Sequence, residues 1–209
     1  MAKSLKVELY TDIVCPWCLI GERRLDNILT TDLADADVDI EHHPVLLMPD
    51  LPDEGIETLA YFRARFGNID PKTMWDRPQA EARKTGLALD LSRQTMLYPT
   101  IRAHTLIRHA RARGTQHALA SALTQSYFQK QFRINDPEAL ASIAVQHGFD
   151  QDEALVLVAS GEERQATVEA AVVSARRGVR SVPTFVINGQ PVQPDSEDAL
   201  AARLIREIT

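Results

Sequence analysis

Cysteine is scarce in this chain: only two of its 209 residues are cysteine, Cys15 and Cys18. Two cysteines three positions apart enclose almost no chain, so a disulfide between them cannot staple a large fold. If the pair does form a disulfide, we expect the purpose of that bond to be chemical.

Long apolar runs are also missing, and none approaches the length needed to cross a bilayer. There is no internal repeat and no low-complexity tract. The first residues, from Met1 to Lys6, show neither the apolar core nor the small-residue cleavage site that is typical of export signals. We therefore expect a cytoplasmic protein that does not enter a membrane.

Clustered positive charge is the third absence. The formal net charge is −6, and short basic groups such as Arg108, Arg111 and Arg113 are expected to form a solvated helix face. This balance argues against nucleic-acid binding. Hydrophobic residues make up 44% and charged residues 25%, which is ordinary for a globular protein. The length fits one core domain with a sizeable insertion.

The first part of the chain predicts a strand, a helix and a second strand. Residues 5–11 alternate apolar and polar side chains, as a half-buried strand does. Pro16 is suited to the first turn of a helix, and apolar residues then recur at helical spacing to about Thr30. Alternation resumes over residues 38–47. This spacing is typical of a βαβ unit, which normally makes a parallel pair.

The middle of the chain reads as helical. Residues 48–55 form a linker, and residues 56–158 contain no convincing strand. Asp136 and Pro137 mark the start of a helix over residues 137–147, with Gly148 as its C-terminal cap. Further helices are predicted over residues 152–159 and 162–177.

Strand character returns near the C-terminus, at residues 182–187. Asn188-Gly189 is a strong two-residue hairpin signal, and a last helix is predicted over residues 197–208. The predicted fold class is α/β: a thioredoxin-like fold, β-α-β followed by α-β-β-α, with a large all-helical insertion. We expect residues 1–55 and 160–209 to form the thioredoxin-like domain and residues 56–159 the insertion.

The motif Cys15-Pro16-Trp17-Cys18 carries the chemistry. At the start of a helix, unpaired N–H groups and the helix dipole stabilise a thiolate and lower its pKa. Cys15 is therefore expected to be the attacking and more exposed thiol. Cys18, one turn further, is placed to resolve a mixed disulfide on Cys15. Pro16 and Trp17 are expected to contact substrate.

Two other interpretations of the cysteine pair stay open. One is half of a zinc site, completed by His42 and His43, although adjacent residues of a strand point to opposite faces. The other is a pair of inert core thiols, because free cysteine is often buried.

The second informative element is Val182-Pro183, which follows a predicted helix and opens a strand. A proline at such a position is a typical place for a cis peptide bond. In a thioredoxin-type fold this loop faces the cysteine pair, where the backbone of Val182 is free to pair with an extended substrate. A trans proline that simply opens an edge strand is the alternative.

With both elements in place, the chain resembles the DsbA family of oxidoreductases, and within it the FrnE-like subgroup. The resemblance covers nearly the whole chain. Its motifs lie at residues 12–18, 20–21, 23–25, 44–49, 52, 55, 98–100, 103–104, 127–128 and 178–185.

The resemblance implies a thioredoxin fold, a redox dithiol and a cis proline at Pro183. The expected activity is thiol–disulfide exchange with protein, peptide or small thiols, without a metal or an organic cofactor and with glutathione as a redox partner. A neighbouring branch resembles glutathione-dependent isomerases such as 2-hydroxychromene-2-carboxylate isomerase, which typically carry serine where Cys15 stands. That activity is one alternative, and a peptide-binding or holdase module is another.

Asp12 and His104 are the candidate tuning residues. Asp12 either relays protons to Cys18 or, by the preferred interpretation, caps the helix or orders the turn. His104 is by default structural, and lining the substrate groove is its alternative role. For several aromatic residues we expect packing within the insertion first and a substrate-facing patch second. These aromatic residues are Phe62, Phe66, Trp75, Phe128 and Phe132.

Overall fold

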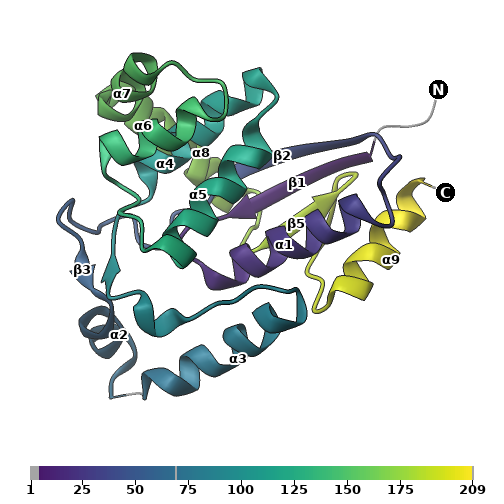
Figure 1. Ribbon diagram of the computed structural model, residues 1–209, viewed down its shortest axis with the longest axis horizontal. Helices are drawn as coiled ribbons and strands as arrows, with labels where there is room; N and C mark the ends of the chain where they lie inside the picture. The colour runs from purple at the N-terminus through teal and green to yellow at the C-terminus, as the bar shows by residue number, and fades with distance from the viewer. Residues whose placement is uncertain (1–4, 69, 209) are drawn as a thin grey trace.

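A mixed four-stranded sheet lies at the centre of the computed structural model, which describes residues 5–68 and 70–208 (Figure 1). Its strands are β1 (Leu5–Thr11), β2 (Val38–Pro44), β5 (Thr184–Ile187) and β6 (Gln190–Val192). Their order in the sheet is β2-β1-β5-β6. β1 pairs in parallel with β2 and antiparallel with β5, as a thioredoxin-like sheet requires. This arrangement confirms the predicted α/β fold class.

Helix α1 (Pro16–Thr30) connects the two parallel strands and begins where the sequence predicts. Figure 1 shows α1 and the last helix, α9 (Glu197–Ile208), against the same side of the sheet. One hydrophobic cluster joins them to β1 and β5, with Leu9, Leu25 and Leu204 among its fully buried members. This cluster is the core of the sheet domain.

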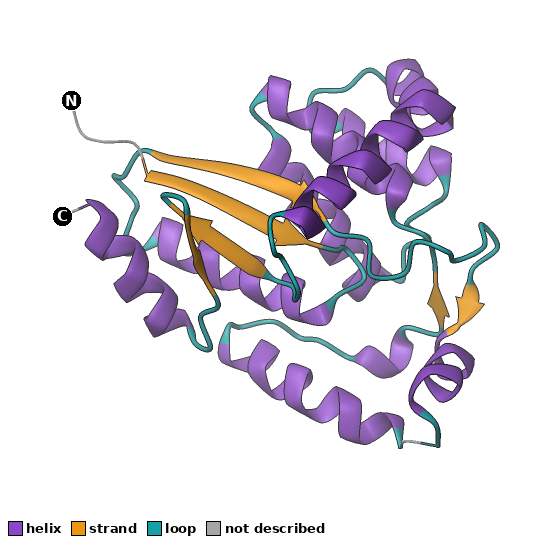
Figure 2. Ribbon diagram, turned by 180° about the vertical axis from the view of Figure 1, so that it is seen from behind, coloured by secondary structure: helices purple, strands orange, loops and turns teal. Residues whose placement is uncertain are grey.

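The other helices are α2 (Thr58–Phe66), α3 (Pro71–Lys84), α4 (Ile101–Ala110), α5 (Gln116–Lys130), α6 (Pro137–Val145), α7 (Gln151–Ala159) and α8 (Gly161–Arg176). They belong to the predicted insertion, except α8, which follows it. They lie in two groups: α4 to α8 gather beside the sheet, and α2 and α3 lie below α1 in the view of Figure 1; Figure 2 shows both groups from behind. None of the helices in residues 5–68 and 70–208 is long and apolar enough for a transmembrane span.

A second hydrophobic cluster crosses the boundary between the sheet domain and the insertion. Ile13, Leu19 and Ile20 come from the β1–α1 region and are buried with insertion residues such as Leu106 and Leu123. The start of α1 is thus anchored in the insertion and not only on the sheet. The domain limits given above stay a prediction, because this shared core marks no sharp border.

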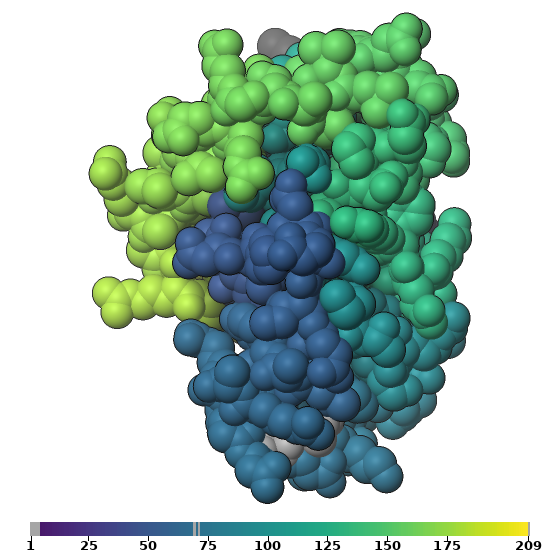
Figure 3. Space-filling view, turned by 90° about the vertical axis from the view of Figure 1, so that its left-hand side faces the viewer, coloured from purple at the N-terminus to yellow at the C-terminus, as the bar shows by residue number. Residues whose placement is uncertain are grey.

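The insertion is not all-helical, so this part of the prediction is wrong. Strands β3 (Ile56–Glu57) and β4 (Met96–Leu97) form a short antiparallel pair. Two residues per strand are too few to show an alternating pattern. A close contact supports the pair: a Cβ on Gly55 would lie 2.7 Å from the Leu97 carbonyl oxygen, and Gly55 has a φ of +80°. Figure 3 shows the molecule from the side that carries this pair. The segment that leads from β2 to β3 is dark blue at the middle of that face, and α2 lies below it.

Two further expectations change in detail. β2 ends at Pro44 and not at residue 47, because Pro44 pairs with Thr11, the last residue of its partner strand β1. The Asn188-Gly189 hairpin is confirmed: both residues have positive φ, and they join β5 to β6. The expectation about export signals rests partly on residues 1–4, which lie outside the described residues.

The basic group on α4 and the following turn is not simply a solvated helix face. Arg108 bonds to Glu163 of α8, and Arg111 bonds to Asp39 of β2 with both guanidinium nitrogens. Arg113 pairs with α7. The prediction failed because the acidic partners lie 40 to 72 residues away in sequence. The pairs of Arg108 and Arg111 tie the insertion to the sheet domain, whereas the pair of Arg113 lies within the insertion.

Candidate dithiol active site

Cys15 is the N-cap residue of α1, with extended backbone angles of φ −92° and ψ 116°. Its carbonyl oxygen accepts hydrogen bonds from the N–H groups of Cys18 at 3.0 Å and Leu19 at 3.3 Å. Pro16 occupies the first helical position, where no N–H partner is needed. Both cysteines are free thiols. The geometry therefore presents one thiol at the helix start and a second one turn inside.

The two thiols differ in acidity. The Cys18 side chain lowers the pKa of Cys15 by hydrogen bonding, which outweighs burial, and the backbone N–H groups of Cys18 and Trp17 add to the effect. Burial raises the pKa of Cys18 well above its ordinary value. Because the thiolate is the nucleophile, this asymmetry favours Cys15 as the attacking thiol, and that role stays a prediction.

Cys15 is the more exposed thiol, as predicted, but the difference is small. Its exposed fraction is 7%, against 0% for Cys18. Access of a substrate to the Cys15 sulfur therefore depends on the side chains around it. Trp17 is half-buried and lines the cavities on both sides of the motif.

Val182 and Pro183 lie directly against the motif. The Cys15 Sγ is 3.9 Å from the Val182 carbonyl oxygen, and the Val182–Pro183 peptide bond is cis. Gly21 makes this approach sterically feasible, because a Cβ at that position would lie 2.9 Å from Pro183 Cγ. The structure thus brings together two segments that are 167 residues apart. The role of Gly21 was not predicted, although residues 20–21 are among the positions that carry the family resemblance.

An apolar cavity of about 370 Å³ opens beside Cys15, between the start of α1 and the insertion. Four of the five aromatic residues that the sequence analysis named line this cavity. Phe132 is the exception, since it packs against the hydrophobic core instead. The aromatic side chains that line the cavity are Trp17, Tyr61, Phe62, Phe66, Trp75, Tyr127 and Phe128.

A more polar cavity of about 510 Å³ lies on the other side of Trp17. Arg77 of α3 places its guanidinium 5.2 Å from the centre of the Trp17 ring. Val182 and Pro183 form part of the opposite wall, with Gln193 beside them. The motif therefore sits between an apolar and a polar recess.

Asp12 and His104 form a buried pair behind the motif. The Asp12 carboxylate accepts a hydrogen bond from the Leu47 N–H at 2.8 Å, and its other oxygen lies 3.2 Å from His104 Nε2. Asp12 therefore orders the turn, which is one of the two structural roles expected for it. It does not cap the helix, because Cys15 is the N-cap and no side chain caps it.

His104 lines neither of the two cavities beside Cys15, so it matches the structural role and not the groove-lining one. The negative charge of Asp12 contributes to the Cys15 pKa by raising it, against the larger lowering effect of the Cys18 hydrogen bond. Tuning of the dithiol by Asp12 and His104 stays a prediction.

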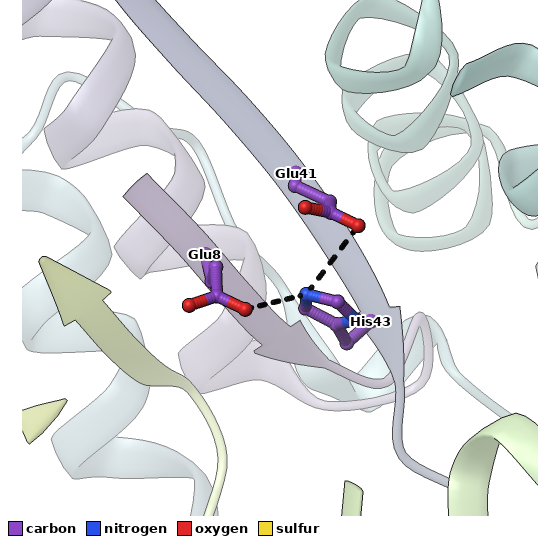
Figure 4. A group of neighbouring side chains, drawn as sticks. All are labelled: Glu8, Glu41 and His43. Atoms are coloured by element: carbon purple, nitrogen blue, oxygen red, sulfur yellow. Dashed lines mark hydrogen bonds and ion pairs between the residues drawn. The ribbon is translucent and has the colours of Figure 1, made fainter. Parts of the chain in front are cut away.

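His42 and His43 point to opposite faces of β2, so they do not complete a zinc site with the cysteines. His43 joins Glu8 and Glu41 in the one group among the described residues whose ligand atoms lie close enough for a metal ion (Figure 4). Lys6 and Arg177 already form ion pairs with the two carboxylates. A divalent cation would have to compete with both. This group is therefore a charge-balanced network of half-buried side chains on the sheet.

The fold and the paired thiols define a thioredoxin-fold protein with a dithiol at the start of its first helix. The sequence matches the model of the DSBA-like thioredoxin domain over residues 6–204. The chain belongs to that family. The predicted resemblance to DsbA proteins is thereby confirmed, while the FrnE-like subgroup stays a prediction.

Solved structures with the same fold include three informative ones. A probable DsbA oxidoreductase from Streptomyces coelicolor is 25% identical, with a TM-score of 0.81, and the match covers 97% of this chain and 89% of that one. The cytosolic disulfide reductase DsbM from Pseudomonas aeruginosa, solved with glutathione, is 16% identical, with a TM-score of 0.67 and coverage of 97% and 98%. A 2-hydroxychromene-2-carboxylate isomerase is 16% identical, with a TM-score of 0.70 and coverage of 97% of both chains. None of the curated proteins matches the sequence.

Proposed function

We propose that this protein is a thiol–disulfide oxidoreductase that exchanges its Cys15–Cys18 pair with protein or small thiol substrates. The observation that carries the proposal is the placement of two free thiols at one helix start, with Cys15 Sγ 3.9 Å from the carbonyl oxygen of Val182 beside the cis Pro183. The pKa values of the two thiols shift in opposite directions, which supports the same chemistry. Cys15 is prepared to attack, and Cys18 stays protonated until it is needed. Membership of a DsbA-like family supports the same chemistry.

In the reducing direction, the Cys15 thiolate attacks a substrate disulfide, forms a mixed disulfide and expels one substrate thiolate. Cys18 then loses its proton and attacks the Cys15 sulfur. The Cys15–Cys18 disulfide forms, the bond to substrate breaks, and the second substrate thiol leaves. The substrate gains two electrons and the protein loses two. The reverse sequence oxidises a substrate dithiol.

Val182 and Pro183 position the partner in this proposal. The carbonyl oxygen of Val182 accepts from the Cys15 thiol in the free protein. Once Cys15 is bonded to substrate, that oxygen is available to accept a substrate N–H, as in strand addition. Trp17 and Pro16 flank the same position. Glutathione is the proposed recycling thiol, with no metal or organic cofactor, and the cytosolic DsbM solved with glutathione supports a cytoplasmic setting.

A second candidate is a glutathione-dependent isomerase or transferase. The two recesses on either side of Trp17 favour it, because one is polar and the other is lined by aromatic rings. Such a reaction needs one thiol at most. The requirement for Cys18 therefore separates the two candidates.

Replacing Cys18 by serine tests the proposal. We expect Cys18→Ser to lose multiple-turnover reduction of a small disulfide with glutathione by more than about tenfold, because the mixed disulfide on Cys15 is no longer resolved. Mass spectrometry should show that adduct accumulating. Cys15→Ser is the control and should neither turn over nor form the adduct. Full turnover by Cys18→Ser would show that glutathione and not Cys18 resolves the mixed disulfide, and would contradict the proposed Cys15–Cys18 exchange.

A further inference from the structure

Three side chains with titratable groups follow one another along a single face of α1. Cys18, Glu22 and Asp26 are spaced four residues apart, so each lies one turn beyond the last, with Cβ atoms about 5–6 Å apart. Exposure increases along this line. Cys18 and Glu22 are 0% and 2% exposed, whereas the Asp26 side chain is 30% exposed. The line thus runs from the buried thiol to the surface.

Glu22 is an unusual buried carboxyl. One of its oxygens, Oε2, has no hydrogen-bond partner among the described residues. Burial raises the pKa of Glu22 to about 8, and the nearby charge of Asp26 acts in the same direction. A buried, unpaired carboxylate is costly, so the group holds a proton at neutral pH.

The groups that face Glu22 come from two helices. On α1 they are the two cysteines and Asp26, and on α5 the Thr124 hydroxyl lowers the Glu22 pKa against the larger effect of burial. Helix α3 contacts α1 through the Arg24–Glu81 ion pair, 2.9 Å long. Glu22 in turn raises the pKa of Cys18, after burial and Cys15 as larger causes. Glu22 and the two cysteines therefore affect each other's pKa through their charges.

The outer end of the line is hydrogen-bonded to α5. Asp26 Oδ1 lies 2.8 Å from His117 Nε2, and His117 Nδ1 lies 2.8 Å from Nε2 of the buried His42. The His117 side chain is 20% exposed. Burial holds the pKa of His42 well below its ordinary value, so that ring stays neutral. Protons that reach Asp26 or His117 can pass directly to water.

We propose that Glu22 exchanges a proton with Cys18 during each catalytic cycle, and that Asp26 and His117 connect Glu22 to solvent. The role applies only if the proposed dithiol exchange is correct. Cys18 is buried and has no exposure to water of its own, yet it must lose a proton to attack. A carboxyl one turn away can take that proton directly or through one water.

The proton and electron balance is simple. In the mixed disulfide, the ionised fraction of Glu22, which is minor at neutral pH and grows toward pH 8, takes the Cys18 proton. The Cys18 thiolate then forms a bond to the Cys15 sulfur. The bond from Cys15 to substrate breaks, and the substrate thiolate leaves with its electron pair. Glu22 then returns the proton to solvent. In the reverse direction, protonated Glu22 protonates Cys18 as that sulfur leaves Cys15.

The test uses 5,5′-dithiobis(2-nitrobenzoic acid), which releases one coloured thiolate when Cys15 attacks and a second when Cys18 resolves. In the unmodified protein, we expect the second, concentration-independent phase to speed up with pH and level off above about pH 8, where Glu22 is ionised. In Glu22→Gln, that phase should be at least about tenfold slower at pH 7 and should keep rising through pH 9, following Cys18 alone. The first phase should change by less than about twofold.

Variants separate proton transfer from structural damage. Glu22→Asp keeps a carboxyl group and should retain the levelling-off, while Asp26→Asn should slow the second phase by a smaller factor. Glu169→Gln, an exposed site on α8, should leave both phases unchanged. A Glu22→Gln profile that matches the unmodified protein overturns the proton path. Absence of any second phase in the unmodified protein refutes the dithiol function itself.

Discussion

At the scale of single residues, the site depends on a contact between α1 and the loop that carries Pro183. Gly21 faces Pro183 at a distance that leaves no room for a methyl group. Cys15 reaches the Val182 carbonyl from the same helix. The position of one glycine therefore determines how closely the two halves of the site approach.

Replacing Gly21 by alanine tests this contact. The added Cβ would lie 2.9 Å from Pro183 Cγ and 3.4 Å from Phe185 Cζ. Overpacking of this kind costs about 1–3 kcal/mol, against about 1 kcal/mol gained in helix propensity. We expect Gly21→Ala to lower the free energy of unfolding in a urea titration and to slow attack by Cys15.

Gly161→Ala is the matched control for that experiment. Gly161 is also helical, and a Cβ there meets no atom within 4 Å. That substitution should stabilise the protein by up to about 1 kcal/mol. A stabilising effect of Gly21→Ala equal to that of Gly161→Ala would show that the contact with Pro183 is unimportant.

At the scale of elements, α1 shows what a sequence can and cannot reveal. Its start is marked by Pro16 and its apolar face by local spacing, so its position and the Cys15–Cys18 pair were predictable. Its polar face was not. Glu22 looks like an ordinary surface glutamate, and only packing against α5, about a hundred residues later, makes it buried. The β3–β4 pair was missed for the same reason, since long-range contact and not local pattern creates it.

The burial of Glu22 between α1 and α5 predicts a pH dependence of stability. Its folded pKa is about 8, above the ordinary value of 4.5, so the folded state binds the extra proton between these values. The contribution of this proton to the free energy of unfolding is complete below about pH 4.5 and is lost as pH rises through 8. The slope is at most about 1.4 kcal/mol per pH unit.

Urea titrations at several pH values measure this effect as a difference between variants. The unmodified protein should lose stability relative to Glu22→Gln as pH increases from 5 to 8, because glutamine does not titrate. Glu169→Gln should show no such trend. A constant difference across this range would contradict the burial of an ionisable Glu22.

At the scale of the whole molecule, the dithiol lies where the sheet domain meets the insertion. The β1–α1 region contributes Ile13 and Ile20 to a core shared with the insertion helices. The apolar cavity beside Cys15 has walls from α1 and from α2 and α3. The insertion thus shapes access to the thiols, whereas the sheet domain holds the thiols and the Val182–Pro183 segment.

This division explains which parts of the site the sequence could predict. The reactive pair and the Val182–Pro183 segment each carry a local motif, and a family resemblance joins them. The two cavities have no local motif, because their walls come from segments far apart in the chain. Aromatic residues such as Phe62 and Trp75 were noticed as a group, but only the fold shows that they face Cys15.

The most direct test of the central claim is the redox equilibrium of the Cys15–Cys18 pair. The protein is equilibrated with glutathione buffers of increasing oxidation, free thiols are alkylated, and the products are counted by mass spectrometry, with Cys15→Ser as control. We predict one reversible two-electron transition, at a potential between about −120 and −270 mV. If no intramolecular disulfide forms at any ratio of oxidised to reduced glutathione, the protein is not a dithiol oxidoreductase.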